Sequence, residues 1–347
     1  ISSRHVPPSD DAIPGGPMAM TGHRVRILIT GGSGFVGRPL VRLLSRNHDV
    51  LVYDALRFGR NRFTEAELAQ IELVEGDVRD PVAVERAVGA FAPEVIVHLA
   101  AVHFIPHCEQ DPVTAVTVNV AGTVNLLGAA PRGCRFVLAS SGAVYGPDHV
   151  PHREDVSALE PSDVYGLTKL QAEGYLQHFS RAKGLAGIAA RLFNVVGPGE
   201  TNPHVLPEIA WQLKTGQSEV RLGNIWPKRD YIHIEDATAG FAALALGGDV
   251  PPGEALAVNL GTARQHSVAE ILHHMRQAAG VDFRVVTDPA RIRAVDRPFL
   301  AADIGRIETR FGWRPKRTIR EAVEDLWRHP DIRPGLFLPD VPAVGTA

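Results

Sequence analysis

The chain has 347 residues, is 45% hydrophobic and carries a formal net charge of -3 at pH 7. This length supports a large core with one doubly wound domain and a smaller attachment, and it excludes a small disulfide-stapled scaffold. The nearly balanced charge, without basic runs interleaved with aromatic residues, argues against nucleic acid or an anionic membrane surface as a partner. Two cysteines and the lack of an uninterrupted apolar run of about 20 residues predict a cytoplasmic protein that binds a small molecule.

Short apolar runs alternate with helix-length segments along the first half of the chain. The runs lie at 26–30, 50–53, 71–74, 95–99, 136–139 and 188–192. This alternation predicts an α/β fold, a doubly wound parallel sheet covered by helices on both faces. After residue 194, prolines and glycines interrupt the pattern until a strand and helix return at 231–246 and one more strand at 257–261. The remainder has predicted helices at 268–279 and 319–327.

A glycine-rich turn follows the first predicted strand. Gly31, Gly34 and Gly37 are spaced three apart between a strand and a helix, a pattern typical of dinucleotide-binding turns. Glycine allows the tight turn and lets the backbone approach the pyrophosphate, which then sits at the helix N-terminus. Asp54 ends the second strand about 20 residues later, where a carboxylate binds the adenosine ribose hydroxyls and repels the extra phosphate of NADP. The pattern therefore favours NAD.

Neighbouring residues extend the predicted cofactor site and leave one alternative open. The further predicted contacts are Phe35, Val36, Asp77, Val78, Leu99, Ala100 and Ala101. Arg57, Arg60 and Arg62 follow Asp54 along the chain. Because guanidinium groups can neutralise a 2′-phosphate, NADP stays open as the alternative cofactor.

Two further motifs indicate hydride-transfer chemistry. Ser141 follows the apolar run at 136–139, and Tyr165 and Lys169 lie four residues apart on a predicted helix. Side chains at this spacing share one helix face, so the ammonium group can stabilise the phenolate. A phenol with a pKa of about 10 needs roughly 4 kcal/mol of differential stabilisation to act as a base near neutral pH. Each feature alone is commonly structural, but their joint occurrence after a nucleotide-binding turn favours catalysis.

Together these segments resemble the extended short-chain dehydrogenases, the nucleotide-sugar epimerase and dehydratase family, from about residue 24 to residue 328. The motifs that carry the resemblance are Thr30-Gly-Gly-Ser-Gly-Phe-Val-Gly37, Asn119-Val-Ala-Gly-Thr123, Ser140-Ser-Gly-Ala-Val-Tyr-Gly146, Tyr165 with Lys169, Arg191-Leu-Phe-Asn-Val-Val-Gly-Pro198 and Arg229-Asp-Tyr-Ile-His233. The resemblance implies a Rossmann-type sheet with a smaller C-terminal α/β substrate-binding domain.

The resemblance also assigns catalytic roles. Tyr165 would be the general base, and Lys169 with the cationic nicotinamide would lower its pKa and contact the cofactor. Ser141 would hydrogen-bond the sugar hydroxyl that becomes a carbonyl. Asn119 would brace the active-site backbone or a water; the structural alternative is that this asparagine simply satisfies buried carbonyl groups.

A nucleoside diphosphate sugar, with uracil or thymine as its base, is the substrate that the resemblance implies. Arg229, Arg293 and Asn194 match the family's diphosphate-binding residues, and guanidinium groups suit bidentate phosphate contacts. Asp296 matches the carboxylate that binds the nucleotide ribose. His204 is assigned to the same substrate-binding set.

Two positions bear on comparison with the galactose epimerases within this family. Leu300 falls where some of them place a bulky tyrosine, so we expect space for a 2-acetamido group. His103 stands where they carry a cofactor-contacting lysine, so it is predicted to line the nicotinamide ribose or the diphosphate. Although His103, His107 and Cys108 lie close together, they lack a paired ligand set with zinc-type spacing, and no metal site is predicted.

The residues after Ser141 bear on the reaction. The family's 4,6-dehydratases carry an acidic pair there and its decarboxylases a glutamate, whereas this chain has Gly142 and Ala143. Without a carboxyl group, C6 protonation has no evident agent at these positions, which favours NAD-dependent 4-epimerisation through a transient 4-keto sugar. An NAD(P)H-dependent 4-keto-sugar reductase is the main alternative because it needs the same three residues. A dehydratase or decarboxylase, and a non-catalytic nucleotide-binding protein, are further alternatives.

The expected organisation divides the chain into two domains and two terminal segments. They are a disordered leader (1–22), an NAD-binding domain (23–194, completed by 232–262), a sugar-binding domain (195–231 with 263–330) and a tail (331–347). The helices at 112–130 and 164–182 are those that the family uses for dimerisation, so the resemblance implies a homodimer. Their apolar faces could equally be buried within the monomer.

Overall fold

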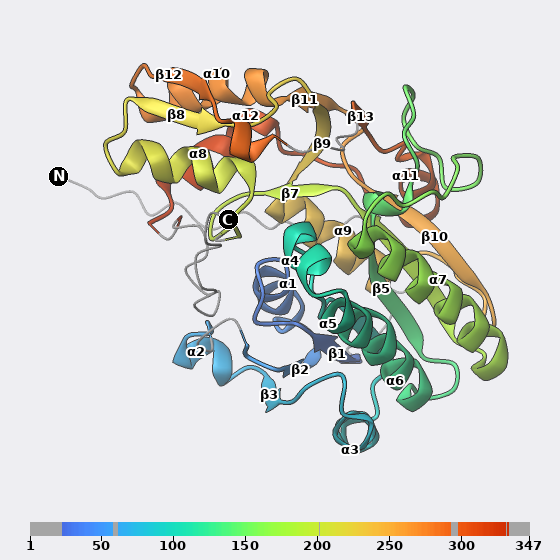
Figure 1. Ribbon diagram of the computed structural model, residues 1–347. Helices are drawn as coiled ribbons and strands as arrows, with labels where there is room; N and C mark the ends of the chain where they lie inside the picture. The colour runs from blue at the N-terminus through green and yellow to red at the C-terminus, as the bar shows by residue number, and fades with distance from the viewer. Residues whose placement is uncertain (1–22, 58–61, 201, 293–297, 331, 333–347) are drawn as a thin grey trace.

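A seven-stranded parallel sheet forms the centre of the computed structural model, which describes residues 23–57, 62–200, 202–292, 298–330 and 332 (Figure 1). Its strand order is β10-β6-β5-β4-β1-β2-β3. The strands are β1 (Arg26–Thr30), β2 (Asp49–Asp54), β3 (Glu72–Glu75), β4 (Val95–His98), β5 (Arg135–Ser141), β6 (Ala186–Leu192) and β10 (Ala255–Leu260). Every neighbouring pair in this order is parallel. The predicted doubly wound fold class is confirmed.

Helices cover both faces of this sheet because successive strand residues point to opposite sides. In β1, Ile27 and Ile29 pack in one core and Leu28 in the other. The first core includes side chains of α1 (Gly37–Leu44) and α9 (Ile234–Leu246). The second includes side chains of α3 (Pro81–Phe91), α6 (Gly122–Ala129) and α7 (Val164–Lys183). This burial on both sides explains the apolar runs of the inner strands.

The segment before α6 is an unbroken helical run with a local irregularity. After α4 (Ile105–Gln110), α5 (Pro112–Val116) leads through a π-helical turn (Thr117–Ala121) into α6. By length and composition alone, the 18-residue run Pro112–Ala129, with mean hydropathy 1.2, could cross a membrane. Threonines and asparagines interrupt its apolar residues, so it is not the uninterrupted apolar run by which a membrane span is recognised in a sequence. In the structure α6 packs between α3 and α7, as expected for a core helix of a globular domain.

A second region carries two smaller sheets and its own core. One sheet contains β7 (Asn194–Val196), β9 (Lys228–His233), β11 (Gln265–Ser267) and β13 (Phe299–Leu300), and the other pairs β8 (Glu219–Leu222) with β12 (Arg284–Thr287). The helices are α8 (Val205–Lys214), α10 (Val268–Ala279) and α12 (Ile319–Arg328). Apolar side chains of these helices, among them Ile209, Ile271 and Val323, form a third core.

The remaining helices are short and lie at the edges of these two regions. They are α2 (Glu65–Leu68) and α11 (Gly305–Phe311). The chain leaves the large sheet at β6, enters the second region at β7, and returns with α9 and β10. The carboxyl ends of the central strands therefore face the second region (Figure 1).

Candidate active site

A cavity of about 680 Å³ lies between the large sheet and the second region. Its floor is formed by residues at or just after the carboxyl ends of the parallel strands, namely Gly31, Asp54, Leu99, Ser141 and Leu192. This is the edge where open α/β sheets bind ligands, and the volume suits a cofactor or a small molecule.

The glycine turn builds the cofactor wall of the cavity. Gly31 has a φ of +68°, and a Cβ added there would lie 2.7 Å from the backbone nitrogen of Ala100. A Cβ on Gly37 would overlap the carbonyl oxygen of Gly31. Phe35 and Val36 line the same wall, and α1 begins directly after them without a side-chain cap at its N-terminus. This cradle fits a pyrophosphate held by backbone N–H groups.

Asp54 lies beside the turn, as a ribose-binding carboxylate should. Its Oδ2 accepts a hydrogen bond from the backbone N–H of Ser33 (2.9 Å), and its Oδ1 accepts one from that of Leu56 (2.9 Å). Leu99, Ala100 and Ala101 follow β4 and line the wall opposite. These positions fit a dinucleotide that runs from Asp54 across the turn.

The far end of this wall contains the predicted adenine contacts. Asp77 and Val78 both line the cavity, and Asp77 forms ion pairs with Arg57 (3.2 Å) and Arg79 (2.7 Å). Arg62 donates a hydrogen bond to the carbonyl of Gly199 (3.2 Å). Arg60 lies outside the described residues. The two described arginines of the NADP alternative are thus engaged with protein groups.

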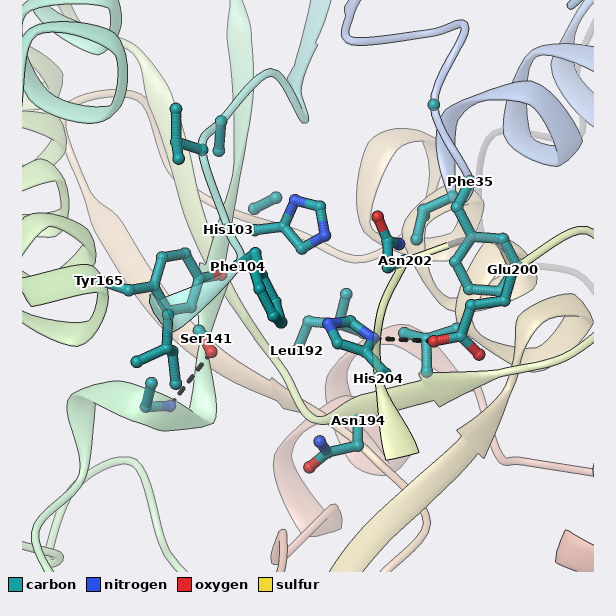
Figure 2. Close-up of a pocket in the computed structure, with 18 of the residues that line it drawn as sticks. Phe35, His103, Phe104, Ser141, Tyr165, Leu192, Asn194, Glu200, Asn202 and His204 are labelled. Atoms are coloured by element: carbon teal, nitrogen blue, oxygen red, sulfur yellow. Dashed lines mark hydrogen bonds and ion pairs between the residues drawn. The ribbon is translucent and has the colours of Figure 1, made fainter. Parts of the chain in front are cut away.

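Three of the four predicted catalytic residues, Ser141, Tyr165 and Lys169, line the cavity, and Figure 2 shows Ser141 and Tyr165 on the side away from Phe35 of the glycine turn. Ser141 ends β5, and its Oγ accepts a hydrogen bond from the backbone N–H of Ala143 (3.1 Å). Tyr165 lies in the first turn of α7, whose N-cap Asp163 accepts a hydrogen bond from the N–H of Gly166 (2.7 Å). Lys169 follows one turn later, with Nζ 5.7 Å from the centroid of the Tyr165 ring. The three side chains line one continuous surface of the cavity.

The protein alone does not make Tyr165 a ready base. Burial raises the pKa of Tyr165, although a hydrogen bond with Ser141 acts in the opposite direction. Burial also lowers the pKa of Lys169 to about 8, against the opposing effects of Cys108 and Glu173. A unit positive charge about 5 Å away at an effective dielectric of about 20 is worth about 3 kcal/mol. An oxidised nicotinamide, when bound near Tyr165, would supply a positive charge that opposes the effect of burial on the Tyr165 pKa.

Asn119 acts on the backbone and does not line the cavity. Its Oδ1 accepts a hydrogen bond from the N–H of Val102 (2.8 Å), and its Nδ2 donates to the carbonyl of the same residue (2.8 Å) and to Thr168 Oγ1 (3.0 Å). The π-helical turn directs this buried side chain toward the loop after β4. Asn119 thus contacts the active-site backbone, which is one of the two roles predicted for it, and we describe it as a positioning residue.

The predicted substrate-binding residues come from scattered segments. Asn194 on β7, Arg229 on β9 and Leu300 on β13 all line the cavity, and the Arg229 Nη1 donates to the carbonyl of Lys228 (2.9 Å). Arg293 and Asp296 lie outside the described residues. The described residues of the predicted substrate wall thus come from strands that are distant in the sequence but adjacent in the small sheet.

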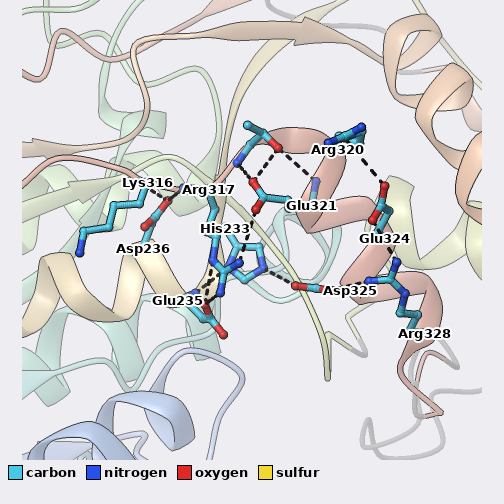
Figure 3. A network of polar contacts seen from close by, with 11 residues as sticks. His233, Glu235, Asp236, Lys316, Arg317, Arg320, Glu321, Glu324, Asp325 and Arg328 are labelled. Atoms are coloured by element: carbon cyan, nitrogen blue, oxygen red, sulfur yellow. Dashed lines mark hydrogen bonds and ion pairs between the residues drawn. The ribbon is translucent and has the colours of Figure 1, made fainter. Parts of the chain in front are cut away.

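A polar network holds β9 against α12 (Figure 3). His233, the last residue of β9, lies 3.3 Å from a carboxylate oxygen of Asp325 on α12. The Asp236 carboxylate accepts the backbone N–H of Arg317 (2.7 Å), and the Arg317 guanidinium pairs with Glu235 (2.6 Å). These contacts fix the strand that carries Arg229, together with α9 that follows it, relative to α12 and the residues just before α12.

A group of polar side chains that includes Glu200, absent from the predicted set, lies near the centre of the cavity (Figure 2). Burial lowers the pKa of His103, and the neighbouring His204 and Lys169 side chains act in the same direction, even though the His103 ring opens onto the cavity. His204 Nδ1 lies 2.8 Å from Oε1 of Glu200. Glu200 and His204 are four residues apart, a spacing that predicts contact on a helix. Here the two residues precede α8, and outside a helix this spacing does not predict that side chains meet.

Residues 27–261 match the model of the NAD dependent epimerase/dehydratase family. The chain belongs to this family. Membership confirms the predicted resemblance to the extended short-chain dehydrogenases and NAD as the cofactor, which fits the glycine cradle and Asp54.

Individual relatives cover nearly the whole chain. The UDP-glucose 4-epimerase of Corynebacterium glutamicum is 34% identical over 323 residues, which are 87% of this chain and 95% of that protein. The GDP-6-deoxy-D-mannose reductase of Pseudomonas aeruginosa is 29% identical over 320 residues, 87% of this chain and 95% of that protein. The solved UDP-glucose 4-epimerase of Thermus thermophilus in complex with NAD has a TM-score of 0.77 and 28% identity, covering 88% of this chain and 98% of that one.

Proposed function

We propose that this protein is an NAD-dependent 4-epimerase of a nucleoside diphosphate sugar of the UDP-hexose type. The observation that carries the proposal is the convergence of Ser141, Tyr165 and Lys169 on one surface of a cavity whose other wall is the glycine turn with Asp54. Similarity to UDP-glucose 4-epimerases along nearly the whole chain supports it.

The reaction uses the two walls together. The glycine turn and Asp54 would hold NAD, which when bound would supply the reversible hydride acceptance that the reaction needs. Tyr165 takes the proton of the C4 hydroxyl, while Ser141 donates a hydrogen bond to the oxygen as it becomes a carbonyl. Lys169 keeps a positive charge near the phenolate. After the 4-keto sugar turns over, Tyr165 returns the proton, and the hydroxyl forms with the opposite configuration.

The substrate wall holds the rest of the molecule. In this proposal Asn194, Arg229 and Arg293 bind the diphosphate, Asp296 binds the nucleotide ribose, and the base is uracil or thymine. Leu300 is buried at the cavity edge, so a 2-acetamido group has more room than a tyrosine would leave. Higher turnover of N-acetylhexosamine nucleotides than of plain hexose nucleotides is the expected result; the reverse order would refute this part.

A 4-keto-sugar reductase is the second candidate, because a reductase from Pseudomonas aeruginosa is similar over almost the same length. It requires the same Ser141, Tyr165 and Lys169 but consumes reduced cofactor. Dependence of turnover on added NADH or NADPH would favour it. Retention of NAD through purification would favour the epimerase.

The same proposal includes a cytoplasmic homodimer. Val113, Val116, Leu167 and Tyr175 on α5 and α7 expose 71%, 42%, 47% and 44% of their surface. The two helices are in contact, so these side chains supply a candidate apolar surface for a second copy. Sedimentation velocity of the purified protein tests it: a single species of about twice the 37.5 kDa chain mass is expected.

Proton NMR tests the central reaction. The purified enzyme is incubated separately with UDP-glucose, UDP-galactose, UDP-N-acetylglucosamine and UDP-glucuronate, with no cofactor added. Appearance of a C4 epimer supports redox-neutral catalysis with retained NAD and identifies the sugar class. Unchanged spectra with NAD demonstrably bound would refute the epimerase proposal for these nucleotides and direct attention to 4-keto sugars with reduced cofactor.

A further inference from the structure

Glu200 and His204 form a buried carboxylate–imidazole pair inside the cavity. Only 2% of the Glu200 side chain is exposed, and its Oε1 lies 2.8 Å from His204 Nδ1. Its Oε2 is buried without a hydrogen-bond partner among the described residues. Leaving a carboxylate oxygen buried and unpaired is costly, so this arrangement needs an explanation beyond loop packing.

The pair determines which nitrogen of His204 faces the cavity. Since an ionised carboxylate only accepts hydrogen bonds, Glu200 in that form places the ring proton on Nδ1 and leaves the lone pair on Nε2. A carboxylate placed in this way holds the ring in one orientation and leaves Nε2 available to accept a proton. The pair therefore has the composition and geometry of a general base with its orienting group.

The free nitrogen of His204 is directed toward the reacting side. In Figure 2 the ring nitrogen away from Glu200 points to the side of the cavity that holds Ser141 and Tyr165. The ring lies between aromatic neighbours, with centroids 5.9 Å from His103 and 6.0 Å from Phe104. The side chain remains 40% exposed, so a proton on Nε2 can exchange with water in the cavity.

We infer that His204, oriented by Glu200, is a second general base that removes and returns a proton on a ring carbon next to the C4 ketone. The inference rests on the proposed function, because only the 4-keto intermediate has an acidic C3–H or C5–H bond. His204 Nε2 takes the proton as that C–H bond breaks. The electron pair forms a double bond to C4, and the carbonyl becomes an enolate that accepts hydrogen bonds from Ser141 and Tyr165.

The step is redox-neutral and needs no further reactant. Return of the proton to the same face restores the ketone, and return to the other face inverts C3 or C5. Gly142 and Ala143 carry no acid or base at the position where the sequence analysis looked for one. Glu200 and His204 supply such a group from the other side of the cavity. The site is thereby equipped for chemistry at a carbon that hydride transfer never touches.

Deuterium exchange tests the inference directly. The NAD-loaded enzyme is incubated in D2O with the nucleotide sugar that it epimerises, and the sugar protons are followed by NMR and mass spectrometry. Hydride return keeps protium at C4, so loss of the H-3 or H-5 signal with a gain of one mass unit reports His204 chemistry and identifies the carbon. Epimerisation without deuterium would overturn the inference and leave the proposed function standing. Neither epimer nor deuterium would overturn both.

Single substitutions with a matched control test whether the deuterium exchange depends on Glu200 and His204. For each variant the readout is deuterium incorporated per epimerisation event, so a general loss of activity cancels. In H204Q this ratio should fall about 100-fold, the usual contribution of a general base. E200Q should reduce it less, because the amide oxygen still accepts from Nδ1. H178Q, a histidine change on the exposed part of α7, is the control and should leave the ratio unchanged.

Retained NAD content shows that each variant is folded. H204Q and E200Q are separate tests, so one can be interpreted even if the other does not fold. If H204Q folds and keeps the wild-type ratio of deuterium to epimerisation, His204 is not the base and the inference fails. A fall in H204Q alone would retain the base and remove the orienting role of Glu200.

Discussion

The two walls of the cavity differ in how they are built. The predicted cofactor wall is formed by the backbone of a short run of consecutive residues, the glycine turn after β1, and by the carboxylate of Asp54 at the end of the neighbouring strand β2. The substrate wall is formed by single side chains from β7, β9, β13 and the loop before α8. A wall made of backbone depends on a few positions, such as the glycines of the turn, and these positions accept few other residues. A wall made of separate side chains allows the family to change substrate and reaction while keeping the cofactor.

The largest effect is expected from Tyr165, which serves both walls. Replacing it with phenylalanine removes the proton-transferring hydroxyl but keeps the ring, so kcat should fall about 1000-fold while NAD stays bound. Steady-state turnover and cofactor content measured on the same sample check this. Y175F, an exposed tyrosine on the same helix, is the control. A binding protein without catalysis would be indifferent to both changes.

Gly31→Ala tests the backbone wall. The new Cβ would meet the Ala100 backbone at 2.7 Å in a left-handed conformation, so NAD affinity should fall about 100-fold, or about 2.8 kcal/mol. Isothermal titration of NAD-free protein measures it. Gly89→Ala on α3 has open space at the Cβ and should leave affinity unchanged and stabilise the helix by about 1 kcal/mol. Equal affinities of the two variants would contradict the cradle.

Lys169 links pH to catalysis. Its pKa is lowered to about 8, so the ammonium that supports the Tyr165 phenolate is lost as pH rises through that value. We expect kcat/KM to fall about tenfold per pH unit above this point, unless another group compensates. In K169R the cation persists, and the alkaline limb should move upward by more than one pH unit even if the rate is lower. An unshifted limb would assign it to another group.

Asp54 should have the smallest effect. Asp54→Ala removes the repulsion of a 2′-phosphate and the ribose contact, so the preference for NAD over NADP should fall about tenfold. Competition binding of the two cofactors measures the ratio. Asp49→Ala, at the exposed start of the same strand, is the matched change. Preference retained in D54A would show that cofactor choice depends on residues other than this carboxylate.

Local sequence patterns were enough to predict the glycine turn, the neighbouring carboxylate and the paired tyrosine and lysine. The turn at Gly31, the position of Asp54 and the shared helix face of Tyr165 and Lys169 depend on residues close together in the chain, so spacing was enough to predict them. The alternating apolar runs likewise predicted the parallel sheet, with boundaries differing by a few residues, as at β3, which starts at Glu72.

Only the tertiary structure decided the rest. It placed Asn119 against the backbone of Val102, raised the pKa of Tyr165 through burial, and brought Glu200 and His204 into the cavity facing Ser141 and Tyr165. These features depend on burial and on contacts between segments far apart in the chain. Residue spacing predicts neither burial nor such contacts, because the path of a loop such as the one before α8 depends on the segments that pack around it.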